Sequence, residues 1–316
     1  MNAVRHYIVR RLLGAVPVLL GISLLAFVLA QLSPGDPAEI MLEAAGTGMP
    51  SAEEVAALHS YLGLDQPAYV QYGLWLWRIL HGDGGISYHL GLPVFTVLLA
   101  RLPVTVMLAA ASLCWAAVGG IGLGLLMARM RGIWAAMLLH GVTQVMLATP
   151  SFLTAILLIL VFGVWLHVLP TNGVDAAAGY LLPSFALALV TLAMTAQLLD
   201  AQLREALASL YAQTARLRGL SEGRVLLIYA LPNALVPVMA MLGNFAAAVL
   251  GGAIIVETVF ALPGIGSLAL DAIHYRDYPL LQGYVLFLGG IYVLVTLAVD
   301  LVLARMDPRI VLGGGD

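Results

Sequence analysis

The sequence contains no lysine, and this absence limits the chemistry that the chain can carry. All 14 basic residues are arginines. A P-loop needs a lysine to reach the β- and γ-phosphates of a nucleotide, so we expect no such ATP site and no ATP hydrolysis in this chain. The formal net charge of −3 is too small to predict nucleic acid as a partner.

Cysteine and charged residues are also scarce. The single cysteine, Cys114, rules out an intrachain disulfide, and its apolar surroundings predict a buried, inert thiol. Charged residues make up 10% of the 316 positions, against about 25% in soluble domains. Hydrophobic residues make up 62%, and the mean hydropathy is +1.00. The composition therefore predicts a membrane protein.

Long apolar runs without Asp, Glu or Arg predict about six transmembrane helices, since about 20 apolar residues cross the hydrocarbon core as a helix. We expect the third to be kinked at Pro150. The first is too long for the apolar part of a cleaved signal peptide, which favours an uncleaved span. The expected spans are Leu12 to Leu32, Val104 to Ala128, Ile133 to Leu166, Leu181 to Leu199, Leu231 to Val256 and Leu280 to Val299.

The arginines predict the orientation, because short arginine-rich loops stay in the cytoplasm. With both termini in the cytoplasm, only Arg78, Arg101 and Arg276 fall outside, and the other 11 of the 14 arginines fall inside. The opposite orientation would reverse this ratio. We therefore expect cytoplasmic N- and C-termini.

The segment 33–102 is then external. Turn signals at Ser33–Pro37 and His81–Gly85 flank a helical pattern around Ser51 to Leu62, in which Ser51 and Glu54 have the spacing of a capping box. Four aromatic residues fit either a belt at the lipid headgroups or the packing of this segment. They are Tyr69, Tyr72, Trp75 and Trp77.

A charged stretch separates the fourth and fifth spans. Its seven charges would cost on the order of 20 kcal/mol at the bilayer centre, so the stretch is predicted to be cytoplasmic. Steps of four and three indicate one helical face that should be covered, made of Leu203, Leu207, Leu210, Thr214 and Leu217. Gly219 is a helix stop that can adopt the left-handed conformation. An amphipathic linker and a docking element both remain open on spacing alone.

The same stretch resembles the coupling loop of permeases from binding-protein-dependent ABC importers. The pattern runs Gln213-Thr214-Ala215, three residues, Gly219, nine residues, then Tyr229-Ala230-Leu231-Pro232. The family pattern is Glu-Ala-Ala, three, Gly, nine, Ile-x-Leu-Pro. Gln213 replaces the glutamate, Thr214 an alanine and Tyr229 the isoleucine, so no charge contact of that glutamate is carried over.

Further stretches, in the expected order, resemble the peptide/nickel branch of this family. The stretch Asp65 to Ser87 looks most like nickel permeases, whereas di- or oligopeptides are the alternative cargo. The matching stretches are LGLDQP with YVQY, GDGGISY, TARLRGLS, VETVFALPGIG, RDYPLLQG and DPRI (Asp307 to Ile310).

The resemblance implies a type I ABC importer permease fold in a bacterial inner membrane. The parts would be a first helix at 1–32, the external segment 33–102, a core at 103–305 with the coupling loop at about 200–224, and a tail at 306–316. Implied partners are a second homologous permease, two ABC ATPase subunits that bind ATP and Mg²⁺, an external solute-binding protein and lipid. The expected ATPase-coupling residues are Gln213, Thr214, Ala215, Arg216, Arg218, Gly219, Leu220 and Pro232.

The stretch VETVFALPGIG is the candidate outer gate. Pro263, Gly264 and Gly266 are expected to end a helix and turn the chain, and Glu257 is either a gate contact or a solvated or salt-bridged cap. Phe260 completes this set. Four of the seven histidines are candidate metal ligands, but they lack metal-ligand spacing, so we predict no metal site; they are His81, His89, His140 and His274.

Two other classes of protein fit the sequence less well. A secondary transporter would carry carboxylates deep in its spans and internal repeats. An intramembrane hydrolase would need a nucleophile facing a base, and neither G-x-S-x-G nor H-E-x-x-H occurs.

Overall fold

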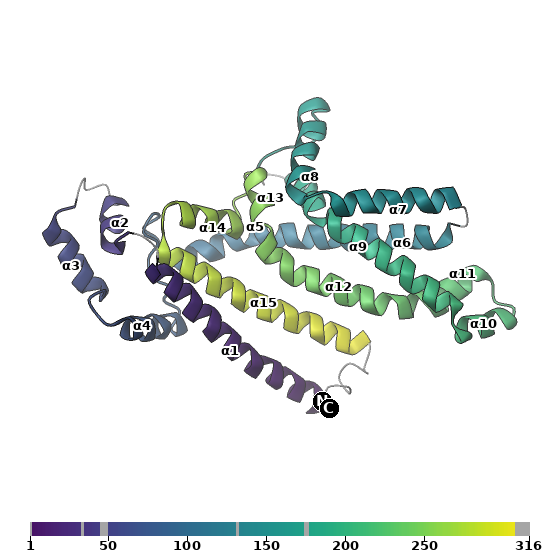
Figure 1. Ribbon diagram of the computed structural model, residues 1–316, viewed down its shortest axis with the longest axis horizontal. Coiled ribbons are helices and arrows are strands. Elements are labelled where there is room, and N and C mark those ends of the chain that lie inside the picture. Colours follow the sequence, from purple (N-terminus) through teal and green to yellow (C-terminus); the bar gives the residue numbers. More distant parts are fainter. Residues whose placement is uncertain (1, 33–34, 45–49, 131–132, 174–176, 307–316) are drawn as a thin grey trace. The chain divides into compact units, whose positions relative to one another are not determined.

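The computed structural model describes residues 2–32, 35–44, 50–130, 133–173 and 177–306, and these residues are mostly helical (Figure 1). The predicted tail and its DPRI motif lie outside the described residues from position 307 on. Two compact units divide the chain. One is built around Val106–Leu262 and the last part of the C-terminal helix, and the other combines Arg5–Thr105 with Pro263–Val293.

Five helical segments are long and apolar enough to cross a membrane. A bent helix pair supplies a sixth if its two halves count as one span. The all-helical membrane fold predicted from the sequence is therefore confirmed. The five segments are Ile8–Leu32, Val94–Arg129, Ala177–Ala208, Glu222–Gly251 and Tyr278–Arg305.

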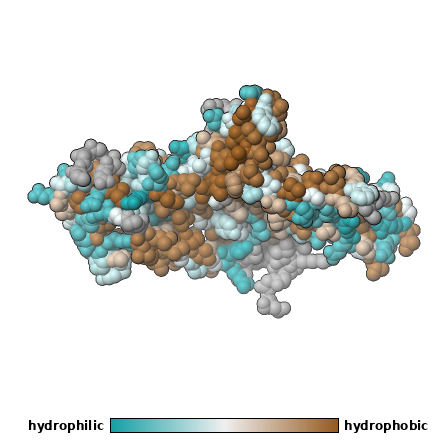
Figure 2. All heavy atoms as spheres, turned by 45° about the horizontal axis from the view of Figure 1, so that its top comes forward, coloured by the Kyte–Doolittle hydropathy of each residue, from teal (hydrophilic) through white to brown (hydrophobic). Residues whose placement is uncertain are grey.

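The predicted third span is broken rather than gently kinked. Helix α7 (Ile133–Ala148) and the pair α8 (Ser151–Leu158) and η2 (Ile159–Trp165) meet at a bend of 102°. Pro150, with φ −61° and ψ 145°, is extended and has no N–H to continue the helix. Figure 2 shows a column of hydrophobic residues at this place, over α8.

Helix α9 (Leu181–Ala208) is the centre of the first unit. It packs against α7, α8, α12 (Leu231–Gly252) and the helix that runs from α5 (Val94–Cys114) through η1 (Trp115–Gly119) into α6 (Gly120–Arg129). These helices bury the side chains of α9 from Leu182 to Ala206 along one face. The charged stretch begins within the C-terminal part of this helix, at Asp200.

Glycines allow α6 to approach α9 closely, as the small-residue stretch Val118 to Gly124 predicts. A Cβ built on Gly124 would lie 2.8 Å from the carbonyl oxygen of Ala196, and one on Gly120 would lie 2.9 Å from that of Leu192. Both distances are too short for a real side chain. The same holds in the small-residue stretch Gly243 to Ala253, where a Cβ on Gly243 of α12 would clash with Val299 of α15 (Tyr278–Met306).

Cys114 does not have the environment expected from the sequence. Its side chain is exposed on the protein surface, so the prediction of a buried thiol is wrong. In a transmembrane helix, apolar neighbours in the sequence do not imply burial in protein, because lipid accepts them as well as a core does.

The second unit has its own core where the start of α5, α14 (Ile265–His274) and the start of α15 meet. Val94, Leu98, Ile265 and Leu280 are almost fully buried there. The N–H of Ile265 donates to the Thr105 hydroxyl at 2.9 Å.

The segment 33–102 forms three short helices, α2 (Pro37–Ala44), α3 (Ala52–Leu62) and α4 (Ala68–Leu80). The predicted capping box is confirmed, because Ser51 Oγ accepts from Glu54 N–H and the Glu54 carboxylate accepts from Ser51 N–H. These bonds from Ser51 lower the pKa of Glu54.

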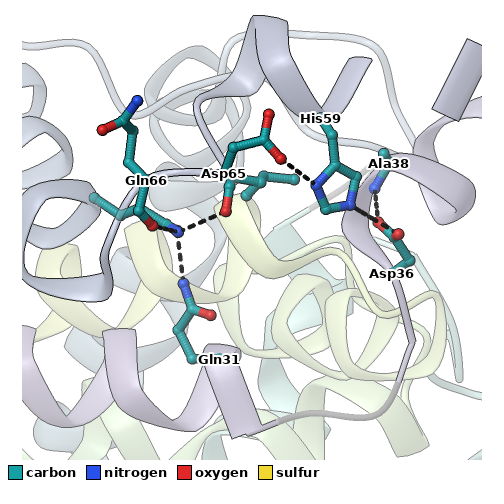
Figure 3. A network of polar contacts seen from close by, with 8 residues as sticks. Gln31, Asp36, Ala38, His59, Asp65 and Gln66 are labelled. Carbon is teal, nitrogen blue, oxygen red and sulfur yellow. Dashed lines mark hydrogen bonds and ion pairs between the residues drawn. The ribbon is translucent and has the colours of Figure 1, made fainter. Parts of the chain in front are cut away.

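His59 joins α3 to the start of α2 (Figure 3). Its Nε2 lies 2.8 Å from Asp36, and its Nδ1 lies 3.6 Å from Asp65. Burial raises the pKa of Asp36, but the Ala38 N–H, at 2.8 Å, and His59 outweigh it and keep that pKa below its ordinary value.

The four aromatic residues of α4 divide between the two alternatives left open by the sequence. Tyr72 and Trp75 pack against Phe27 of α1 (Asn2–Leu32), with ring centroids 5.4 and 6.0 Å from it. Tyr69 and Trp77 are exposed. One pair therefore packs the segment, and the other remains available to lipid headgroups.

Candidate functional site

The predicted coupling loop begins within a helix. α9 continues past the expected span end at Leu199 and carries Asp200, Arg204 and Glu205 before it ends at Ala208. Ser209 is extended, with φ −69° and ψ 159°, and a short helix, α10 (Leu210–Leu217), follows it. The break at Ser209 lets the chain change direction between the two helices.

The single leucine face predicted from Leu203 to Leu217 is not observed. Leu203 is fully buried in α9, whereas Leu210 and Leu217 of α10 are 83% and 89% exposed. The extended residue Ser209 interrupts the helical periodicity, so leucines before and after it point to different surroundings. The prediction failed because it treated two helices as one.

Small residues form the buried face of α10. Ala212 and Ala215 pack against Val225, and Leu207 and Leu220 border this cluster. Alanines bring α10 close to the returning chain without needing a large core. Two of the predicted coupling residues, Ala215 and Leu220, therefore hold the loop together from inside.

Gly219 ends α10 in a Schellman motif. It adopts φ +79°, its N–H donates to the Arg216 carbonyl at 2.9 Å, and the Leu220 N–H donates to the Ala215 carbonyl at 3.3 Å. The left-handed conformation is costly for residues with a Cβ, which explains the glycine. The predicted helix stop is confirmed.

Arg216 braces the loop. Its Nε lies 2.9 Å from Glu222 Oε1, and its Nη1 donates to the Leu207 carbonyl at 2.9 Å. The guanidinium of Arg216, on α10, thus connects the end of α9 to the segment that returns toward the next span. This internal use accounts for two of the closely spaced charges around Gly219, Arg216 and Glu222.

Gln213 and Thr214 also bond within the loop. Gln213 Nε2 donates to the Ala208 carbonyl at 3.0 Å, and Thr214 Oγ1 donates to the Leu210 carbonyl at 2.8 Å. Ala208 is the last residue of α9, so the glutamine amide satisfies a helix-end carbonyl. A glutamate, which the related pattern has at this position, could not donate this bond when ionised.

The chain returns through α11 (Glu222–Arg224) and a π-helical turn, η4 (Val225–Ala230), to α12. Pro232 is the second residue of α12 and directly follows the π-helical turn, and it has no N–H to donate to that turn. The ring of Pro232 is exposed, as are the side chain of Arg218 and the two leucines of α10.

Comparison with known proteins identifies the family. Residues 120–312 match the family described as the inner membrane component of binding-protein-dependent transport systems, and residues 4–109 match its N-terminal component. The chain belongs to this family. It is an importer permease of the inner membrane, and its peptide/nickel-type resemblance is confirmed.

Relatives align with this permease along nearly its whole length. A putative peptide transport permease of Brucella suis is 38% identical over 311 residues, which cover 96% of this chain and 98% of the relative. The glutathione transport permease GsiC of Escherichia coli K12 is 36% identical over 305 residues, with the same two coverages.

Solved structures share the fold. The inward-facing MetNI methionine ABC transporter matches with a TM-score of 0.56 at 16% identity, over 67% of the permease and 97% of that chain. An amino acid ABC transporter crystallised with histidines matches with a TM-score of 0.51 at 18% identity, over 68% and 94%.

In the first unit of the permease, Glu257 and Phe260 belong to the candidate outer gate. α13 (Ile254–Val259) holds Glu257, which is fully buried, so it is not a solvated cap. Phe260 is 1% exposed and follows the last helical residue. The Leu262 N–H donates to the Glu257 carbonyl at 2.7 Å, which closes the turn around Ala261 at φ +50°.

The other three gate candidates begin the next helix in the second unit. Gly264 is the N-cap of α14, and Gly266 is the second residue of that helix. Pro263 precedes them and is partly exposed. The chain does turn at Pro263 and Gly264, but Gly266 starts a helix rather than ending one.

Asp277 is a structural residue that sequence reasoning missed. It is fully buried and accepts from the Ser87 hydroxyl at 2.5 Å, the His89 N–H at 3.2 Å and the Leu280 N–H at 3.2 Å. Asp277 therefore caps the N-terminus of α15. It also connects the stretch Gly82 to Tyr88 (GDGGISY) to the stretch Arg276 to Gly283 (RDYPLLQG). The resemblance named both stretches, but nothing in their spacing indicated that they meet.

Asp200 is another buried carboxylate of the first unit. Asp200 is 3% exposed, and Arg204 Nε reaches both of its oxygens at 3.0 Å. His140 Nε2 of α7 lies 3.4 Å from it. His140 thus has a carboxylate neighbour, and within the described residues no group of three metal-type ligands forms.

Proposed function

We propose that this permease forms half of the translocation pathway of an importer for short peptides, driven by ATP hydrolysis on partner subunits. A second homologous permease would supply the other half. Two ATPase subunits would bind ATP and Mg²⁺, and an external binding protein would deliver the cargo. The sequence alone favoured nickel as the cargo. The full-length likeness to peptide and glutathione permeases supports short peptides instead.

The exposed leucines of α10 carry the proposal for ATPase coupling. Leu210 and Leu217 are seven residues apart and so share one face of the helix. Both are almost fully exposed, whereas the opposite face of α10 packs inside the loop. Exposed apolar side chains on a braced helix fit a groove on a protein partner.

The bracing makes α10 suitable as a lever. Arg216, Gln213 and Gly219 fix its start and end through bonds within the loop. A partner that changes shape on binding nucleotide would move α10 as one piece, together with α9 and α12 at its two ends. The energy would come from the partner's different affinity for the two arrangements.

Replacing Leu217 by Asp tests the docking. We expect the ATPase subunits to co-purify at least about tenfold less with the variant, because an interface anchor contributes about 2 kcal/mol or more. Tyr61→Asp is the matched control, since Tyr61 is 84% exposed on α3, in the external segment. Unchanged co-purification of Leu217→Asp would contradict a docking role for α10.

Uptake by cells with and without this permease tests the cargo. We expect loss of the permease to abolish uptake of labelled dialanine or glutathione and to leave uptake of radioactive nickel unchanged. The reverse result would restore nickel as the cargo. Loss of both would indicate a permease shared by two transport systems.

A further inference from the structure

The second unit contains a small, partly open pocket lined by three charged side chains, Arg101, Asp271 and Asp277. Its volume is about 190 Å³, and α5, α14, the residues after Tyr88 and the start of α15 form its walls. Leu268, Ala272 and Leu280 line its floor and belong to the core of the unit.

Two opposite charges line this pocket without pairing. Arg101 comes from α5 and Asp271 from α14. Within the part of the chain that the structure describes, neither side chain has a hydrogen-bond or ion-pair partner. Arg101 is half-buried, and an unpaired charge in such a place gains more from a ligand than one in open water.

The third charge in the pocket is already satisfied. Asp277 holds three hydrogen bonds from Ser87, His89 and Leu280, so it contributes to the frame rather than to a ligand site. The His89 ring stacks on Tyr275 with centroids 3.6 Å apart and forms a flat wall. The pocket thus presents one free cation, one free anion and an aromatic surface.

We propose that this pocket binds a dipeptide by both of its ends, with Arg101 contacting the C-terminal carboxylate and Asp271 the N-terminal ammonium group. The pocket is smaller than the 300–1,000 Å³ of typical drug-sized sites, so it suits a free amino acid or a dipeptide rather than a longer chain. A ligand with both charges satisfies both side chains at once. The assignment rests on the proposed peptide transport.

A zwitterionic phospholipid headgroup carries the same pair of charges, so the test must separate the two sources. The complete transporter is reconstituted in nanodiscs of phosphatidylglycerol, which lacks an ammonium group. Binding of radiolabelled alanyl-alanine is measured together with its N-acetyl and C-amide forms. We expect each blocked form to bind the unaltered transporter about tenfold more weakly than the free dipeptide.

Two variants then assign each charge to its partner. Asp271→Asn should weaken the free dipeptide about tenfold and leave the N-acetyl form unchanged, because that form has no ammonium group. Arg101→Met should weaken the free dipeptide equally and leave the C-amide form unchanged. Glu53→Gln and Arg78→Gln, which remove exposed charges of the external segment, should change nothing.

Equal binding of free and blocked dipeptides by the unaltered transporter would overturn the proposal, even if a variant fails to fold. Displacement of the dipeptide by phosphatidylethanolamine and by free phosphoethanolamine would assign the pocket to lipid and overturn it as well. Peptide uptake without this terminus-dependent binding would reject the pocket and leave the proposed transport function standing.

Discussion

The coupling loop and the outer pocket use their charges in opposite ways. In the loop, Arg216, Glu222 and Gln213 bond to neighbours within the chain, and the two exposed leucines remain for a partner. In the pocket, Arg101 and Asp271 stay unpaired above an apolar floor. A helix that transmits movement needs internal stiffness, whereas a recognition site needs polar groups that the ligand completes.

Replacing Gly219 by Pro gives the largest expected effect, and it separates the two regions. Proline cannot adopt φ +79°, and it lacks the N–H that donates to Arg216. We expect peptide uptake and ATPase co-purification to be abolished, with membrane insertion and alanyl-alanine binding unchanged. Gly223→Ala is the control, because Gly223 has an ordinary helical conformation and open space around it. Normal uptake by Gly219→Pro would contradict the lever.

Asp277→Asn should destabilise the second unit. It tests whether ligand binding in the pocket depends on the hydrogen bonds that Asp277 accepts. An asparagine amide group facing Ser87 and His89 replaces an acceptor by a donor, and the loss is about 2 kcal/mol. The midpoint temperature of thermal unfolding of the purified permease should fall for Asp277→Asn and stay unchanged for Asp271→Asn. Both variants should bind dipeptide poorly. If Asp271→Asn unfolds as early as Asp277→Asn, Asp271 is structural as well.

Arg216→Ala should weaken the brace of the coupling loop and lower peptide uptake several-fold. The expected cost is about 1 kcal/mol, because the Arg216–Glu222 pair is partly exposed and an exposed pair contributes little. The charge-swapped double variant, Arg216→Glu with Glu222→Arg, should recover part of the uptake. Equal uptake by the single and double variants would show that the salt bridge does not stiffen the loop.

The smallest expected effect is the pH dependence contributed by Tyr88. Burial, and next the nearby Asp277 carboxylate, raise the pKa of Tyr88 from 10.0 to about 12. The unfolded chain therefore loses this proton first, so stability is full below pH 10 and falls as pH rises toward 12. Tyr88→Phe should flatten this fall in alkaline unfolding, and Tyr61→Phe should not. An unchanged fall in Tyr88→Phe would exclude Tyr88 as its cause.

Sequence patterns predicted the features that depend on neighbouring residues. The capping box at Ser51, the left-handed stop at Gly219 and the interruption at Pro150 all follow from local backbone chemistry, and each was found. The continuous leucine face was not found, because the extended Ser209 gave no signal strong enough to divide the helix. The sequence also provided no indication that Arg216 bonds to Glu222 and to the Leu207 carbonyl.

The sequence by itself determined that this chain is a helical membrane protein of the importer permease family, since apolar length, arginine placement and motif order act without distant contacts. The tertiary structure decided which polar groups bond to other groups of the chain and which remain available to a ligand or partner. Ser87 and Asp277 are far apart in the chain, and only folding brings them to 2.5 Å. A charge is available to a ligand or partner only after such internal bonds have formed, and spacing along one chain does not reveal them.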